Sequence, residues 1–173
     1  MKKLALILLS LLALGRSYGQ ITYNNSIGLG MYACNLGVAP AINYTPRVNI
    51  MSVTKEGSVS LSIPFGLGYT PNGGALSNSL VLDIPIMADV NLGHASSPDG
   101  VSDIGEFFGI GYGFNLFGNT PSSNASHGLI LNAGARMRIA EKSYGIRVSY
   151  MRNFMTGGSS IFGAGLFYTF GEF

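Results

Sequence analysis

The chain has 173 residues, of which 47% are hydrophobic and only 10% charged, so its composition excludes a disordered protein. Its single cysteine, Cys34, excludes a disulfide scaffold and is either an inert thiol or paired with another molecule. The formal net charge of +2 includes three basic residues in the first 16 positions, and the rest of the chain has seven basic and eight acidic residues. A nucleic-acid partner is therefore not indicated.

Residues 1–19 have the pattern of a secretory signal peptide. Two lysines precede an apolar run from Leu4 to Leu14, and small residues stand just before Gln20. This run is shorter than the roughly 20 residues that a membrane-spanning helix needs. We therefore expect cleavage before Gln20 and export of a single domain, 20–173.

Beyond the signal peptide, apolar and polar residues alternate with the period of a β-strand that has one apolar face. Between Leu80 and Leu92 every even-numbered residue is apolar, whereas the odd-numbered ones include Asp83, Asp89 and Asn91. The same pattern predicts eight strands in chain order, near 25–34, 41–53, 57–69, 78–92, 104–117, 127–140, 143–155 and 161–171.

These segments are longer than the strands of a soluble β-sandwich, which average about 5–6 residues and carry charge on their outer faces. Here the apolar face is continuous and the other face is rich in glycine and serine. Lipid against the apolar face and a narrow polar lumen explain this pattern. The prediction is an all-β fold, an eight-stranded antiparallel up-and-down transmembrane β-barrel.

The even strand number places both termini on the periplasmic side. Short turns at 54–57 and 140–143 fall on that side, and connections rich in Gly, Asn and Ser fall on the other, near 35–40, 70–77, 118–126 and 156–160. The connection 93–103 is long although it lies on the periplasmic side. We expect it to contact a periplasmic or membrane protein partner.

Aromatic residues are expected to form girdles at the two membrane interfaces. The inner girdle comprises Phe108, Tyr144 and Phe170, and the outer one comprises Tyr44, Tyr69, Phe114 and Phe162.

Six charged residues have the parity of the lumen: Arg47, Asp83, Asp89, Arg136, Arg138 and Arg147. The interior of an eight-stranded barrel is just wide enough to be filled by side chains. We expect these residues to form a charge network that plugs the barrel, with arginines paired to the two aspartates and glycines making room for them. The alternative is a narrow solute pore.

With its strand number, its alternation, the signal followed by Gln20 and the ending Phe-Tyr-Thr-Phe-Gly-Glu-Phe, the chain resembles the small eight-stranded outer-membrane barrels of the OmpA/OmpX type. It is particularly similar to the short barrels of Bacteroidota-like bacteria. The resemblance implies residence in the outer membrane, lipid contact, and recognition of Phe173 by the barrel-assembly machinery. It implies no single activity.

One catalytic alternative is a lipid A-modifying hydrolase, because outer-membrane lipid A deacylases carry His, Ser and Glu on the barrel surface. The chain offers His127, Ser126 and Glu141, but Leu129 stands where the His-x-Ser pattern needs serine. His94 lies near Asp99 and Asp103 in the connection 93–103, but we expect a solvated loop there rather than a metal site. A nucleotide-binding loop needs a helix after it, and none is expected after the Gly-rich stretches. We expect a structural or interaction protein without enzymatic activity, metal or cofactor.

Overall fold

The computed structural model describes residues 21–34, 37–70, 79–98, 100–119, 122–155 and 160–171, with the backbone alone at 117–119 and 122–124. The expected signal peptide and the expected assembly signal at Phe173 lie outside the described residues. No helix long and apolar enough to span a membrane occurs in this described part.

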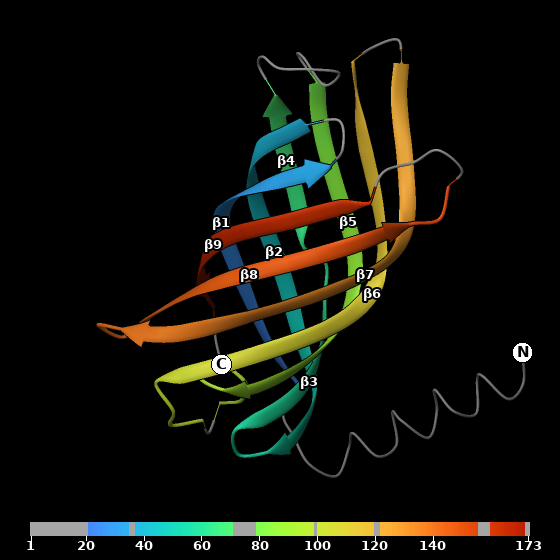
Figure 1. Cartoon of the computed structure of the whole chain (residues 1–173). Helices are drawn as coiled ribbons and strands as arrows, with labels where there is room; N and C mark the ends of the chain where they lie inside the picture. Colours follow the sequence, from blue (N-terminus) through green and yellow to red (C-terminus); the bar gives the residue numbers. More distant parts are fainter. Residues whose placement is uncertain are drawn as a thin grey trace, which may run out of the picture.

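All regular structure in these residues is β-strand (Figure 1). In chain order the strands are β1 (Thr22–Cys34), β2 (Gly37–Thr54), β3 (Gly57–Ser62), β4 (Phe65–Thr70), β5 (Ser79–Gly93), β6 (Ile104–Asn119), β7 (Ser122–Ile139), β8 (Lys142–Asn153) and β9 (Ile161–Phe170).

The sheet closes on itself, because β1 pairs with β2 on one side and with β9 on the other. All pairings are antiparallel, and strands consecutive along the chain pair side by side in the barrel wall, except for β3 and β4. β3 and β4 both lie between β2 and β5, so they occupy a single position in the wall. The nine strands therefore form a barrel of eight positions, which confirms the predicted fold class.

The strand expected at 57–69 is interrupted between β3 and β4. The interruption contains Pro64, which has no N–H to donate to the ladder. Ile63 still donates its backbone N–H to the carbonyl of Pro46 on β2, at 3.1 Å. The wall thus stays continuous across the break.

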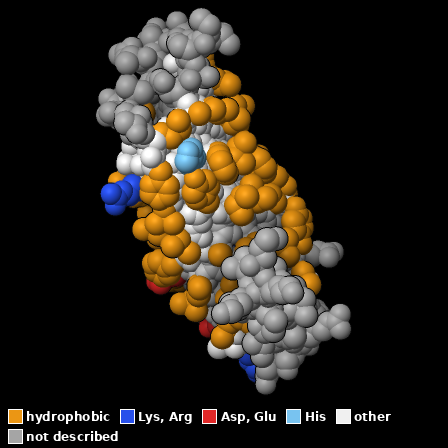
Figure 2. All heavy atoms as spheres, turned by 90° about the vertical axis from the view of Figure 1, so that its right-hand side faces the viewer, with side chains coloured by type: hydrophobic (Ala, Val, Ile, Leu, Met, Phe, Trp, Pro, Cys, Tyr) orange, Lys and Arg blue, Asp and Glu red, His pale blue; other side chains and the backbone are white. Residues whose placement is uncertain are grey.

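The apolar parity of each strand faces outward and the opposite parity faces the lumen. Neighbouring residues differ sharply: Phe108 is 55% exposed and Phe107 only 1%, and Ile86 is 55% exposed and Met87 only 1%. Hydrophobic side chains consequently cover much of the outer surface (Figure 2). An exposed apolar belt of this extent is unsuited to water and suited to lipid.

We call the end with the β2–β3 and β7–β8 turns the inner end. There Ala140 and Glu141 have positive φ angles of 48° and 66°, which fits a tight two-residue hairpin.

At the opposite, outer end the strands continue further than the sequence pattern predicts. The β6–β7 ladder extends to the Asn119–Ser122 pair, so the connection expected at 118–126 shortens to 120–121. Similarly, β2 already begins at Gly37, within the connection expected at 35–40. Serine, glycine and asparagine are frequent at the facing ends of β6 and β7, and β2 begins with Gly-Val-Ala-Pro. The alternation of apolar and polar residues therefore ends before the backbone pairing does.

Candidate functional site: the interior of the barrel

Four of the charged residues expected in the lumen lie deep inside it. Arg47, Asp83, Asp89 and Arg136 are each at most 4% exposed. Arg147 also points inward and is partly buried.

Arg138 does not join this group. It lies at the inner end, where its Nη1 is 3.7 Å from Asp103 Oδ1 in a largely exposed ion pair.

The buried arginines are not paired with the aspartates. Among the described residues the Arg138–Asp103 contact is the only ion pair. Arg47 and Arg136 instead both donate to Asn91 Oδ1, at 2.8 and 2.9 Å. Both also donate to the backbone carbonyl of Ala95, at 2.6 and 3.4 Å. The expected arginine–aspartate pairing is therefore wrong. Arg47 and Arg136 instead share two uncharged acceptors, Asn91 Oδ1 and the carbonyl oxygen of Ala95.

The two aspartates accept hydrogen bonds from uncharged side chains of neighbouring strands. Asp89 accepts from the Ser62 hydroxyl and Asp83 from the Asn115 amide, each at 2.5 Å. Asp89 lies near Arg47, Arg136 and Arg147, so it balances part of their charge without direct contact.

Two aromatic rings complete the arginine layer. The guanidinium carbon of Arg136 lies 4.4 Å from the ring centroid of Phe107, and that of Arg147 lies 5.4 Å from the same centroid. Arg147 also lies 5.5 Å from the centroid of Phe167 and donates to Thr45 Oγ1 at 2.9 Å. These cation–π contacts stabilise charges that have few polar partners.

The sequence suggested that glycines make room for the arginines. In the structure they make room for these aromatic rings instead. A Cβ added at Gly134 would lie 2.3 Å from the Phe107 ring, and one at Gly145 would lie 2.4 Å from the Phe167 ring. The sequence does show that Phe107 has the lumen parity, but it does not reveal which glycine faces it across β6 and β7.

An apolar layer also crosses the lumen. The buried residues that form it are Tyr32, Ala39, Ala41, Val81, Met87, Ile130, Met151 and Ile161. The expectation of a polar lumen therefore holds for only part of its length. Aliphatic and thioether side chains from several strands pack against one another here.

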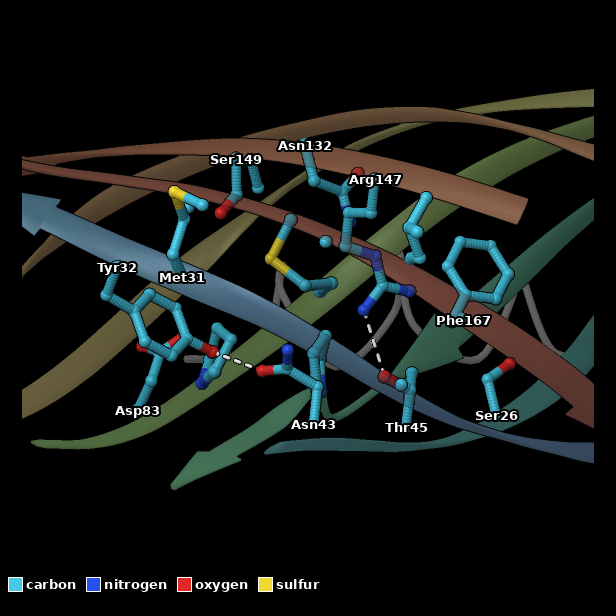
Figure 3. Close-up of a pocket in the computed structure, with 18 of the residues that line it drawn as sticks. Ser26, Met31, Tyr32, Asn43, Thr45, Asp83, Asn132, Arg147, Ser149 and Phe167 are labelled. Atoms are coloured by element: carbon cyan, nitrogen blue, oxygen red, sulfur yellow. Dashed lines mark hydrogen bonds between the residues drawn. The ribbon is translucent and has the colours of Figure 1, made fainter. Parts of the chain in front are cut away.

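A small cavity remains beside both layers (Figure 3). Its volume is about 40 Å³, and its lining includes Tyr32, Asp83 and Arg147. Tyr32 donates its hydroxyl to Asn43 Oδ1 at 2.6 Å, which fixes one wall. A cavity of this size holds water-sized molecules and nothing much larger.

The connection between β5 and β6 folds into the inner mouth of the barrel. Residues 94–97 are each at most 5% exposed. The Ala95 carbonyl binds the two arginines described above, and Ser97 donates to the carbonyl of Lys55. In contrast, Val101 is 80% exposed. The connection is thus partly an internal plug, and only its second half is available to a partner.

His94 lies within this plug. Burial, followed by the nearby charges of Arg138 and Arg136, lowers the pKa of His94, and Asp103 opposes the shift. Arg138 approaches His94 Nδ1 at 3.3 Å. The ring is therefore favoured in its neutral form.

All seven residues expected in the aromatic girdles are exposed on the outward face: Tyr44, Tyr69, Phe108, Phe114, Tyr144, Phe162 and Phe170. Tyr44 differs from the prediction, which assigned it to the outer girdle, in its position along the barrel axis. Its hydroxyl donates to Asn25 Oδ1 at 2.6 Å, and Asn25 pairs with Phe170 near the inner end. Tyr44 thus reaches toward the inner girdle, because its long side chain extends along the strand.

The residues considered for hydrolysis do not form a catalytic site. Ser126 is 7% exposed inside the barrel, where it accepts a hydrogen bond from Asn153. His127 is on the opposite face, as strand alternation requires, and Glu141 is in the turn at the other end of β7. Among the described residues no group of His, Cys, Asp and Glu is suited to hold a metal ion.

Comparison with known proteins gives similarity in structure only. No protein-family model matches the sequence, and neither does any curated protein. The attachment invasion locus protein Ail of Yersinia pestis, solved with the heparin analogue sucrose octasulfate, superimposes with a TM-score of 0.60 at 12% identity, covering 87% of this chain and 99% of Ail. The chain has the fold of the small outer-membrane β-barrels.

A second barrel supports this assignment. Neisserial surface protein A superimposes with a TM-score of 0.52 at 11% identity, covering 86% of this chain and 95% of that protein. The outer membrane enzyme PagL gives a TM-score of 0.48 at 15% identity, which is too distant to bear on activity. These similarities establish the fold alone.

Proposed function

We propose that this protein is an integral outer-membrane barrel with a closed lumen, acting as a structural or interaction protein of the cell envelope. The observation that carries the proposal is the filling of the lumen by the apolar layer, the arginine–phenylalanine layer and the buried segment 94–97. A solute would have to displace all three. The outward apolar belt supports residence in a membrane.

The test is the conductance of the refolded protein in a planar lipid bilayer. We expect no stepwise currents from the wild-type chain or from Arg136→Gln, because the apolar layer remains closed when the arginine is neutralised. Arg138→Gln, at the exposed rim, is the matched control. Reproducible current steps whose size changes in Arg136→Gln but not in Arg138→Gln would instead establish the narrow pore.

We also propose export through a cleaved signal peptide. The basic start, the short apolar run and the small residues before Gln20 support cleavage at that position. Membrane fractionation followed by intact mass measurement tests this: the protein should be in the outer membrane with Gln20 as its first residue. A mass that includes residues 1–19 would refute cleavage.

The exposed half of the connection 93–103 is the proposed contact for a partner protein. Val101 supports this, since it is an apolar side chain 80% exposed beyond the barrel wall. Gentle purification should recover a stoichiometric companion that is lost in Val101→Asp. Pro98 is exposed in the same connection, and Pro98→Ser is the control that should retain it. Purification of the wild-type barrel alone would refute this contact.

A further inference from the structure

Two basic side chains, Arg152 and His127, lie on the outer half of the described lipid-facing surface. Apart from these two, the Asp, Glu, Lys and Arg side chains on the outward faces of the described strands are Glu106 and Lys142, and both lie near the inner end. Arg152 and His127, in contrast, lie toward the outer end of β8 and β7. Figure 2 shows a histidine ring on this face among hydrophobic side chains.

These two residues are neighbours. Arg152 pairs with Leu129, and Phe154 donates its backbone N–H to the carbonyl of His127 at 2.9 Å. Arg152 and His127 are therefore diagonal neighbours on one face, a relation that places side-chain origins about 7–8 Å apart. Both side chains can reach one ligand.

Aromatic side chains surround His127 and fix its orientation. Its ring lies 5.7 Å from the ring of Tyr112 and 6.3 Å from that of Phe114, measured between centroids. Phe154 packs against Tyr112 at 6.5 Å. The Tyr112 hydroxyl hydrogen bonds to His127 Nδ1, so Nε2 remains for another partner.

Arg152 has no counter-charge among the residues that the structure describes. Its guanidinium makes no hydrogen bond or ion pair with any described residue. Described acidic side chains lie inside the barrel or at the inner end, and the outer connections 35–36, 71–78, 120–121 and 156–159 contain no Asp or Glu in the sequence. A cation left unpaired beside lipid is unfavourable unless an anion comes from outside the protein.

We propose that Arg152 and His127 form a binding site for the phosphate group of a lipid in the outer leaflet. A guanidinium recognises phosphate through charge-assisted hydrogen bonds, and His127 Nε2 supplies a second donor. The acyl chains would then lie along the apolar residues below, such as Leu131 and Tyr150, which form a cross-strand pair. This inference rests on the proposed membrane location.

The experiment is lipid binding by the full mature chain, refolded in an uncharged detergent and analysed by native mass spectrometry. The probes are a bisphosphorylated lipid A, the same lipid without phosphates, and inorganic phosphate. We expect the wild-type chain to bind phosphorylated lipid A at least tenfold more tightly than the dephosphorylated lipid, and inorganic phosphate not at all at the same concentration.

Arg152→Gln should weaken binding of phosphorylated lipid A about tenfold, which corresponds to about 1.4 kcal/mol. His127→Gln should weaken it less, and the mass of the lipid should stay unchanged in every variant. Lys142→Gln, which removes an outward cation at the inner end, is the matched control and should bind like the wild type. Equal binding by wild type and Arg152→Gln, an equal loss in Lys142→Gln, or equal binding of both lipids would overturn the proposal.

The same preparations separate this inference from the proposed function. A folded barrel migrates differently from the unfolded chain on an unheated gel, which reports the fold independently of lipid. Folded, non-conducting protein that shows no preference for the phosphorylated lipid refutes the binding site and leaves the closed barrel intact. Binding of inorganic phosphate as tight as that of phosphorylated lipid A would identify a phosphate site independent of lipid and also overturn the proposal.

Discussion

Substitution of Phe107 tests whether the alternating faces are assigned correctly and whether the arginine layer stabilises the barrel. The ring is 1% exposed and contacts the guanidiniums of Arg136 and Arg147. Its chain neighbour Phe108 is 55% exposed on the outward face. The two positions have the same side chain in opposite environments, and so provide a matched comparison.

Phe107→Leu retains most of the apolar volume but removes both cation–π contacts. At up to about 2 kcal/mol for each desolvated contact, we expect a loss of roughly 2–3 kcal/mol in the free energy of unfolding. Phe107→Ala should lose more, about 3–5 kcal/mol, because it also leaves a cavity. Phe108→Leu exchanges one lipid-facing apolar side chain for another and should change stability by less than about 0.5 kcal/mol.

The assay is urea unfolding of the barrel in lipid vesicles, followed by the gel mobility of unheated samples. The chain contains no tryptophan, so intrinsic tryptophan fluorescence does not report its folding. A loss in Phe108→Leu equal to that in Phe107→Leu would refute the assigned faces. No loss in Phe107→Leu would show that the guanidinium–ring contacts contribute nothing.

Three further predictions concern the lumen and the plug. Asn91→Leu should destabilise the barrel by about 2–4 kcal/mol in the same assay, because two buried guanidiniums lose a shared acceptor. Asn91→Asp keeps an acceptor oxygen and should retain stability. Equal losses in the two variants would contradict the role of Asn91 as the shared acceptor. Gly134→Ala should cost about 1–3 kcal/mol, because the added Cβ would overlap both the Phe107 ring and the backbone carbonyl oxygen of Ile146, and a neutral result would contradict this close packing around Gly134. Because the pKa of His94 is lowered in the folded state, its contribution to stability is present above pH ~6.5 and decreases as the pH falls from there through the lowered pKa. His94→Gln should therefore make the loss of stability between pH ~7 and ~5 less steep. If the variant and the wild type show the same dependence of the urea midpoint on pH, His94 does not contribute to it.

The sequence alone determined the barrel, because lipid imposes a pattern with a period of two that no soluble fold needs over such lengths. Leu80–Leu92 identifies one face as apolar at every position, and the structure orients that segment as the alternation requires. The count of eight wall positions followed from the same signal. The outward position of the girdle aromatics followed too, since parity assigns a side chain to one face.

Tertiary structure alone decided how the lumen is filled. Parity places Arg47, Arg136 and Asn91 inside the barrel, but their hydrogen bonds depend on the relative shift of strands that are not neighbours in sequence. The Ala95 carbonyl is an acceptor only because the connection after β5 turns back into the inner mouth of the barrel. Every residue has a backbone carbonyl, so the amino-acid pattern does not show which one accepts a hydrogen bond. Likewise, the proximity of Arg152 to His127 came from the register of β7 against β8. Periodicity reports the environment on each side of a strand, whereas partners across a barrel are set by registers and by the closure of the wall, which a local pattern does not encode.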